Sequence, residues 1–578
     1  AVAYAADINP ASPDMNRYSN FDSLCDAADD FVFGRGGRRI PDTSLTAAHG
    51  WYTHDDPYLD LAKIHPLNSS HVPIGTALGH TAPVPTNTPL LTGRAASAHA
   101  ADAKDRSRTP YGIPKTSDFT VLPHLPALHE LSDEHKTRAL AAVHKEIESL
   151  VKLETFAWDL QSNVKVELKL KMLMKVKYDA DGAYEKHKAR LVAQGFLQRY
   201  GRDYEHTYSP TVNYSTIRII LAIAVAHGWI LKQADVGNAY CHSYMDKPLW
   251  GRLPSGITVH NSSATDGRSY ALRINKGLYG TRQGGRLWNE LLHRNLVSFG
   301  FSQSTADPCL YYRTKDDHHT YICTYVDDLL ITGSSDDQVR ALIDMLKSPG
   351  PLKEQWPVSE GDLNSFIGVH YKYNRAERKL EMRHTAFRRN LLEKYKLSHL
   401  KPARTTVPPL ERDKAPGQNA TQEAWDKDPA AHDTALTHYS NIVGALVYDA
   451  MTIAPHFAYP VKQLCKDMHS PDAGSATSLI QFLMYLRTHE DTPLVFQAGS
   501  RPAHFSPVTF YDASHANVKS DAKLRATAGH VTYVNGCPVD YRSVTLHFSG
   551  IGPNESEAHA ASLASAATKW TRHMLLEL

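Results

Sequence analysis

Two adjacent aspartates, Asp327 and Asp328, could do chemistry because they interrupt an apolar stretch at residues 321–332. Neighbouring carboxylates in a buried strand repel each other and are costly to desolvate unless a positive charge compensates them. A divalent cation is the simplest such charge, and Mg²⁺ is the ion expected for oxygen ligands alone. The alternative is a tight polar hairpin tip between two buried strands, with no chemistry. The other four Asp-Asp pairs stand in polar company and are typical of solvated turns.

A metal site for phosphoryl transfer needs a third carboxylate, and Asp235 is the candidate that the sequence offers. It ends the strand-like run 230–235, and Gly237 breaks the strand soon after it. Two Mg²⁺ ions held about 3.5–4 Å apart would activate an attacking hydroxyl and stabilise a departing pyrophosphate. Mn²⁺ could replace Mg²⁺ at such a site. Alone, Asp235 would be only a strand cap, so the assignment depends on the Asp-Asp pair.

Basic side chains are concentrated in one stretch ahead of these aspartates. Residues 164–202 hold ten Lys and Arg against four Asp and Glu, whereas the whole chain holds 63 against 61 and has a formal charge of only +2. A nucleic-acid surface must therefore be a local concentration of charge, because the chain has no global excess. The stretch 164–202 is the predicted location.

The spacing of apolar side chains predicts the elements that position these residues. Residues 164–178 alternate Val, Leu and Met with Lys and Glu, which is the period of a strand. The turn signal at 179–182 and a second strand at 188–194 predict a basic hairpin. Residues 215–227 are apolar nearly all round and predict a buried helix. Further helices are predicted at 134–152, 283–299, 335–346, 386–395, 439–451 and 556–576, and strands at 508–512, 528–534 and 539–541.

Composition excludes several classes of protein. The six cysteines are scattered and contain no Cys-x-x-Cys pair, which argues against a disulfide scaffold or a zinc ribbon. No apolar run approaches the roughly 18 residues of a membrane-spanning helix, and the N-terminus shows no signal-peptide pattern. Residues 1–118 contain 11 of the 33 prolines, which predicts a flexible or irregular extension. We expect an intracellular protein of three or four domains from a chain of 578 residues.

At these positions the chain resembles the reverse transcriptases of copia-type (Pseudoviridae) LTR retrotransposons. The blocks Asp235-Val-Gly-Asn-Ala-Tyr240 and Tyr325-Val-Asp-Asp328 are similar to the palm of these polymerases. The block Lys188-Ala-Arg-Leu-Val-Ala-Gln-Gly195 is similar to their fingers signature. Further similar blocks lie at 203–210, 216–218, 275–284 with Trp288, 366–368 and 439–448. The similarity covers roughly residues 130–578, and the order and spacing of the blocks make it specific.

The resemblance implies that eight matched residues form the polymerase site. The metal ligands would be Asp235, Asp327 and Asp328. The nucleotide-binding residues would be Lys188, Arg190, Tyr240, Gln283 and Gly284. In this assignment the two basic residues hold the incoming triphosphate, and the tyrosine stacks under the sugar and excludes a 2′-hydroxyl. The alternatives are a solvated basic strand and a core aromatic.

The fold that the resemblance implies is α/β (α+β), a right-hand polymerase followed by a connection and a partial ribonuclease H-like domain. Its expected boundaries are 1–118 for the extension, 119–400 for fingers, palm and a helical thumb near 375–400, 401–505 for linker and connection, and 506–578 for the nuclease-like part. There Asp512 and Glu557 would be metal ligands, with Glu555 a weaker candidate. The family continues to a further aspartate, whereas this chain ends at Leu578. We therefore expect an incomplete and inactive nuclease.

The implied function is that of an RNA-directed and DNA-directed DNA polymerase, which extends a primer 3′-hydroxyl with dNTPs and copies retrotransposon RNA into cDNA. Its partners would be an RNA template, a DNA primer or RNA–DNA hybrid, and dNTPs. A tRNA primer, a second copy of the chain and an integrase are further candidate partners, and no membrane contact is expected. Such a protein would act in the cytoplasm, in a virus-like particle, or in the nucleus. The alternative is a domesticated, non-enzymatic nucleic-acid-binding or scaffold protein that keeps the fold.

Overall fold

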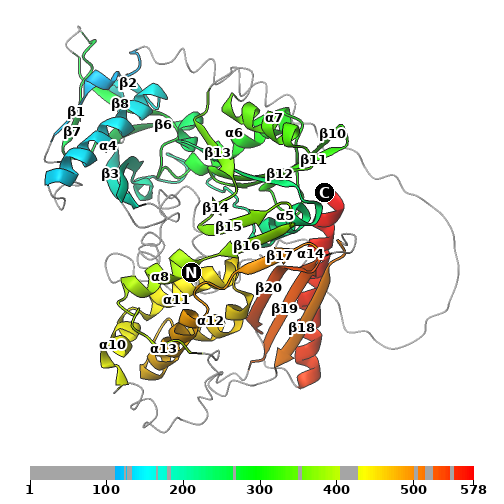
Figure 1. Cartoon of the computed structure of the whole chain (residues 1–578). Coiled ribbons are helices and arrows are strands. Elements are labelled where there is room, and N and C mark those ends of the chain that lie inside the picture. Colours follow the sequence, from blue (N-terminus) through cyan, green and yellow to red (C-terminus); the bar gives the residue numbers. More distant parts are fainter. Residues whose placement is uncertain are drawn as a thin grey trace, which may run out of the picture.

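The computed structural model describes residues 111–122, 125, 133–164, 167–178, 184–264, 268–348, 355–403, 427–499, 505–514, 525–546 and 552–578. The first 110 residues of the predicted extension lie outside this part of the chain, as does most of the predicted linker after residue 403. Figure 1 shows the elements from a cyan lobe through a green central sheet to yellow helices and an orange and red C-terminal part. The mixed α/β fold predicted from the sequence is confirmed.

The centre of the molecule is an antiparallel sheet of six strands in the order β13-β5-β12-β11-β10-β9. These strands are β5 (Ile230–Val236), β9 (Ser302–Gln303), β10 (Leu310–Lys315), β11 (His318–Tyr325), β12 (Asp328–Gly333) and β13 (Val358–Asp362). Successive side chains of a strand point to opposite faces. Leu329 and Ile331 accordingly enter one apolar core, and Leu330 enters another.

Helices cover both faces of this sheet. The core that contains Leu329 and Ile331 also contains residues of α6 (Gly284–Ser298) and α7 (Asp336–Lys347). On the other face lies α5 (Tyr214–His227), whose residues 215–226 are all buried, as the apolar pattern predicted. The central sheet is therefore held between two layers of helix.

A second sheet carries the basic hairpin. Its five strands have the order β2-β8-β6-β3-β4 and are β2 (Phe156–Leu160), β3 (Glu167–Tyr178), β4 (Tyr184–Ala193), β6 (Tyr244–Arg252) and β8 (Tyr270–Lys276). β3 and β4 form the predicted hairpin, with Lys175 opposite Lys188. The helix α4 (Asp133–Lys152) contributes Val143, Ile147 and Leu150 to the core under this sheet. Nearby, β1 (Phe119–Val121) pairs with β7 (Ile257–Val259).

A four-stranded sheet and a group of helices follow the central sheet. The strands, in sheet order, are β14 (Ser365–Phe366), β15 (Val369–Asn374), β16 (Lys379–Arg383) and β17 (Leu494–Gln497). The helices are α8 (Thr385–Lys394), α10 (Pro429–Thr437), α11 (Tyr439–Thr452), α12 (Ala458–Cys465) and α13 (Ala473–Thr488). The helical thumb predicted near 375–400 is wrong in part, because alternating burial of Leu380 and Met382 makes residues 379–383 a strand.

The C-terminal part is a three-stranded antiparallel sheet with one long helix. β18 (Val508–Ser514), β19 (Thr527–Val534) and β20 (Cys537–Thr545) pair in that order, and α14 (Pro553–Glu577) packs on β18 and β19. Buried hydrogen bonds join this part to α5. Ser215 Oγ donates to Asp540 at 2.6 Å, and Arg218 Nε donates to the Val539 carbonyl at 2.8 Å. The C-terminal sheet is therefore docked directly on the centre of the molecule (Figure 1).

Short 3₁₀ helices complete the described elements. They are η5 (Thr116–Asp118), η7 (Gln161–Asn163), η8 (Gly195–Leu197), η9 (Ala239–His242) and η10 (Pro455–Phe457). Within the described ranges, no helix combines the length and the apolar character needed to cross a membrane.

Candidate active site

The three aspartates singled out in the sequence meet at one end of the central sheet. Asp235, near the end of β5, lies directly opposite Asp328, the first residue of β12. Directly opposed side chains of an antiparallel pair project from the same face, with Cβ atoms about 4.5–5.5 Å apart. Asp327 lies in the turn between β11 and β12, and its carbonyl accepts a hydrogen bond of 3.0 Å from the Val236 amide. Strand pairing thus gathers carboxylates that are distant in the sequence.

The turn that carries Asp327 is strained and is held by a tryptophan. Val326 has a φ of +59°, which is rare for a β-branched residue and costs about 1–3 kcal/mol. The Trp288 indole N–H donates to the Val326 carbonyl at 2.7 Å, and the Trp288 side chain is almost fully buried. Such strain persists only where the surroundings impose it. The position of Asp327 is therefore fixed by α6 as well as by the sheet.

The charges at this end of the sheet act strongly on Asp327. Its side chain is half-buried, whereas Asp235 is exposed. Burial, and then the negative charge of Asp235, raise the pKa of Asp327, while Arg190 and Lys188 act in the opposite direction. The ionised form of this carboxyl is therefore disfavoured in the free protein and would be stabilised by an approaching cation.

The donor atoms fit a hard divalent cation. All three aspartates offer carboxylate oxygens, which Mg²⁺ and Mn²⁺ prefer to nitrogen or sulfur. Among the residues that the structure describes, no group of three or more Asp, Glu, His or Cys side chains is placed so that it could hold a metal ion. The arrangement therefore offers ligands from two strands without a preformed cage.

Arg190 places a cation beside the aspartates. It lies on β4, and its guanidinium carbon is 4.5 Å from the centre of the Tyr279 ring. Its Nη1 is buried and has no hydrogen-bond partner in the described part of the chain. A buried donor without an acceptor is costly in the free protein, and an anionic ligand such as a phosphate would satisfy it. Lys188 lies two residues earlier on the same face of the strand and is half-buried.

Tyr240 packs against Tyr279, the ring that lies under this cation, and is covered by its neighbours. Its side chain is 1% exposed, and its ring centre is 4.9 Å from that of Tyr279. Gly284 lies against the Tyr240 ring, and it is glycine because a Cβ there would be 2.6 Å from Thr281 Oγ1. Sequence reasoning placed Tyr240 against a nucleotide sugar. The structure brings it to the site, with little of the ring open to solvent.

Gln283 is also close to the site, and its side-chain amide makes hydrogen bonds within the protein. The side chain is fully buried. Gln198 Nε2 donates to Gln283 Oε1 at 2.9 Å, and Gln283 Nε2 donates to the Asp203 carbonyl at 2.9 Å. Gln283 thus joins the segment after β4 to the start of α6. Its predicted contact with a nucleotide stays a prediction.

Two glycines, which sequence reasoning did not single out, bring the basic hairpin to the aspartates. A Cβ on Gly195 would lie 2.0 Å from the Gly280 carbonyl oxygen, and a Cβ on Gly280 would lie 2.1 Å from the Ala193 oxygen. Gly280 also has a φ of +88°, which only glycine adopts without strain. In this contact the Ala193 amide donates to the Tyr279 carbonyl at 2.7 Å. The signal in the sequence was the presence of a glycine in each of two separate blocks.

The candidate nuclease residues lie apart from this site, in the C-terminal part. Asp512 is exposed on β18, and Glu555 and Glu557 are half-buried in the first turns of α14. The helix is fixed to the strand by a 2.6 Å hydrogen bond between Thr509 Oγ1 and Thr568 Oγ1. Within the described part of the C-terminal region, these residues belong to no group of three acidic, His or Cys side chains that could hold a metal ion.

Comparison with known proteins finds a family whose sequence model matches the part of the chain that contains this site. The model of the reverse transcriptase (RNA-dependent DNA polymerase) family matches residues 156–409. This range contains all eight residues of the predicted polymerase site. The resemblance to copia-type reverse transcriptases is confirmed by this match and by the retrotransposon relatives.

Among these relatives, the retrovirus-related Pol polyprotein from transposon RE1 of Arabidopsis thaliana is 28% identical over 458 residues, 78% of this chain and 29% of the relative. The corresponding polyprotein from transposon TNT 1-94 of Nicotiana tabacum is 27% identical over 451 residues, 78% of this chain and 32% of the relative. The chain thus spans about a third or less of these polyproteins. A transposon Ty5-1 protein of Saccharomyces cerevisiae is 28% identical and matches 54% of this chain and 92% of its own length.

Among solved structures, the foamy viral protease-reverse transcriptase dRH in complex with ds DNA is similar, with 12% identity and a TM-score of 0.36. The similarity covers 82% of this chain and 69% of that one.

Proposed function

We propose that this chain, whose residues 156–409 match the reverse transcriptase family, extends the 3′-hydroxyl of a nucleic-acid primer with dNTPs on an RNA or DNA template. One observation carries the proposal. Asp235 and Asp328 are paired across β5 and β12, Asp327 lies in the adjoining turn, and Arg190 acts electrostatically on Asp327. Carboxylates opposite a basic group are what a metal-assisted phosphoryl transfer requires.

The residues that would hold the metal are the three aspartates. Two Mg²⁺ ions, when bound, would neutralise the charge of the triphosphate and polarise the reacting oxygens. The raised pKa of Asp327 supports this assignment, because a bound cation would offset both its burial and the charge of Asp235. Trp288 would keep Asp327 in place through the hydrogen bond to Val326, so that little reorganisation is needed when a substrate arrives.

Arg190 and Lys188 would bind the triphosphate of the incoming nucleotide. The free Nη1 of Arg190 supplies a donor without an acceptor, and the Tyr279 ring holds the guanidinium in one orientation. Phosphate oxygens make strong, charge-assisted hydrogen bonds to such a donor. Catalysis would then consist of positioning the primer hydroxyl and the α-phosphate and of neutralising charge.

The nucleic-acid partners would be an RNA template with a DNA primer, or the hybrid that they form. The family match and the retrotransposon relatives support this choice. Binding through phosphates would tolerate many sequences and weaken as salt is added.

Primer extension tests the proposal directly. The full chain is assayed on poly-rA primed with oligo-dT in the presence of Mg²⁺, next to Asp327→Asn/Asp328→Asn and a matched control, Asp316→Asn/Asp317→Asn. The control pair occupies an exposed turn between β10 and β11, at positive φ that asparagine also tolerates. We expect extension by the wild type and the control and none by the catalytic variant. Extension by all three, or by none, would refute the proposed function.

A further inference from the structure

A buried glutamate lies behind the strand that carries Arg190. Glu146 belongs to α4, and its side chain is only 9% exposed. Acidic side chains are seldom buried so deeply unless they are paired or hydrogen-bonded. The Oε1 atom of Glu146 accepts a hydrogen bond of 3.1 Å from the amide of Leu191, the residue that follows Arg190 on β4. Sequence reasoning did not assign this glutamate to the site.

We propose that Glu146 is a positioning residue, whose hydrogen bond with the Leu191 amide fixes β4 so that Arg190 faces the incoming triphosphate. The proposal rests on the proposed function for the triphosphate. For the hydrogen bond and the packing it rests on the structure alone.

The strand β4 needs partners from outside its sheet. It stands at the end of the order β2-β8-β6-β3-β4, so one of its edges has no neighbouring strand among the described residues. Amides along a strand alternate between its two edges, so those of Leu191 and Ala193 both point away from β3. Glu146 accepts from the first, and the Tyr279 carbonyl accepts from the second at 2.7 Å. These two acceptors therefore complete the edge next to Arg190.

The helix α4 packs on the face of β4 that is opposite to Arg190. Leu191 lies in one apolar core with Val143 and Ile147 of α4. Successive side chains of a strand point to opposite faces, so Arg190 projects from the other face. Apolar contact is non-directional, whereas a hydrogen bond has a preferred distance and angle. The core therefore brings helix and strand together, and the bond to Glu146 fixes the position of the strand on the helix.

The charges around Glu146 agree with this role. Burial raises the pKa of Glu146, while its hydrogen bond to the backbone and the positive charges of Arg190 and Lys188 lower it. The same two cations act on the carboxyl of Asp327. The basic side chains of β4 therefore interact with a carboxyl behind the strand as well as with one at the site.

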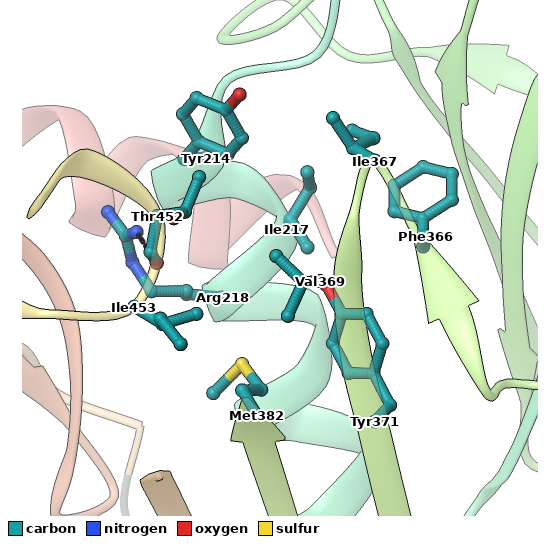
Figure 2. A pocket seen from close by; sticks show the side chains of 10 residues that line it. All are labelled: Tyr214, Ile217, Arg218, Phe366, Ile367, Val369, Tyr371, Met382, Thr452 and Ile453. Atoms are coloured by element: carbon teal, nitrogen blue, oxygen red, sulfur yellow. Dashed lines mark hydrogen bonds between the residues drawn. The ribbon is translucent and has the colours of Figure 1, made fainter. Parts of the chain in front are cut away.

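A second buried arginine shows how a guanidinium is held when its acceptors lie within the protein. Arg218 of α5 lines the cavity in Figure 2, beside Thr452. It donates to the carbonyls of Met451, Thr452 and Val539 at 2.8–2.9 Å. The Nη1 of Arg190 has no such acceptor among the described residues. The direction of Arg190 therefore depends on the strand that carries it and on the ring beneath it.

The same helix also holds the segment that follows Asp235. Ser149, one turn after Glu146, accepts a hydrogen bond of 2.8 Å at its Oγ from Asn238 Nδ2. Asn238 has a φ of +52° and directly precedes the 3₁₀ helix η9. Residues three apart on a helix lie on the same side of it. One side of α4 therefore contacts both the strand of Arg190 and the segment after Asp235, and fixes them relative to each other.

The experiment compares two substitutions of Glu146 in the full chain. Glu146→Asp keeps the charge but shortens the side chain by one methylene, which withdraws the acceptor from the Leu191 amide. Glu146→Gln keeps the length and an acceptor oxygen and removes the charge. The matched control is Glu148→Asp, which shortens an exposed side chain on the same helix. Hydrogen exchange of the amides of residues 189–193 should be faster in Glu146→Asp alone. Unchanged exchange in that variant would overturn the role in holding the strand.

Primer extension then tests the role toward the triphosphate. We expect Glu146→Asp to raise the KM for dNTP by roughly three- to tenfold, because a buried amide loses its acceptor next to Arg190. The KM for the primer–template should not change. Glu146→Gln and Glu148→Asp should keep the wild-type KM for dNTP. An unchanged KM for dNTP in Glu146→Asp, or an equal rise in Glu146→Gln, would overturn the positioning role.

A double substitution shows whether Glu146 acts through Arg190. In an Arg190→Met background, Glu146→Asp should cause no further rise in the KM for dNTP, because residues in one chain of contacts have non-additive effects. Additive rises would overturn this coupling. A wild type that extends no primer would refute the proposed function, and the role toward the triphosphate with it, whereas the exchange measurement would still decide whether Glu146 holds the strand.

Discussion

Arg190 offers a test in which activity should fall while stability changes little. Replacing it with methionine keeps an unbranched apolar stem over the Tyr279 ring and removes the charge and all five donors. If Arg190 binds the triphosphate, the loss of charge-assisted hydrogen bonds should cost about 1.5–3 kcal/mol. The KM for dNTP should therefore rise by roughly 10- to 150-fold.

The stability of the protein should change little in the same variant. The Nη1 of Arg190 is buried without a hydrogen-bond partner among the described residues, so its removal relieves a desolvation cost of about 1–3 kcal/mol. The lost contact with the Tyr279 ring costs about 0.5–2 kcal/mol. We expect a free energy of unfolding that is unchanged or slightly higher, measured by denaturant titration.

Arg190→Met should also shift the pH dependence of extension. Burial and Asp235 raise the pKa of Asp327, and Arg190 lowers it. Without Arg190 this pKa rises further, so the acid limb of the activity profile should move to higher pH. The control is Lys186→Met, which removes an exposed positive charge from the same strand and should leave the KM for dNTP and the pH profile unchanged. A marked loss of stability in Arg190→Met with an unchanged KM for dNTP would show that Arg190 is a structural residue and would refute the reasoning.

Three further predictions follow from other contacts. Burial alone would raise the pKa of Asp449, but the Arg388 guanidinium at 2.6 Å lowers it to about 2. This ionised carboxylate should therefore contribute about 2 kcal/mol to the free energy of unfolding above pH 4, and denaturant titrations at successive pH values should show that contribution lost as the pH falls toward 2. Gly280→Ala should abolish expression of folded protein or lower its melting temperature sharply, because the added Cβ meets the Ala193 oxygen at 2.1 Å; a normal melting curve would contradict this. We expect no cleavage of the RNA strand of an RNA–DNA hybrid, and any cleavage that Asp512→Asn removes would contradict it.

The sequence alone determined the elements whose signals are local. The all-apolar segment of α5 and the alternating lysines of β3 each predicted the observed element. The apolar residues around Asp327 and Asp328 predicted one strand-like run, which the structure divides at a turn into the strands β11 and β12. These signals are contained within one strand or one helical turn, so no long-range contact is needed to interpret them. The residue types also predicted the chemistry, because adjacent carboxylates in an apolar stretch favour a compensating cation.

Only the tertiary structure decided how these residues are held. It showed that the Gln283 side-chain amide is hydrogen-bonded to Gln198 and Asp203, and that the Tyr240 side chain is buried by its neighbours. It also replaced part of the predicted helical thumb with the strand β16. Each outcome depends on side chains that are far apart in the sequence. Glu146 and Leu191 illustrate the reason: the edge of one strand and the carboxylate that completes it belong to different elements, and no periodicity within either segment records their contact.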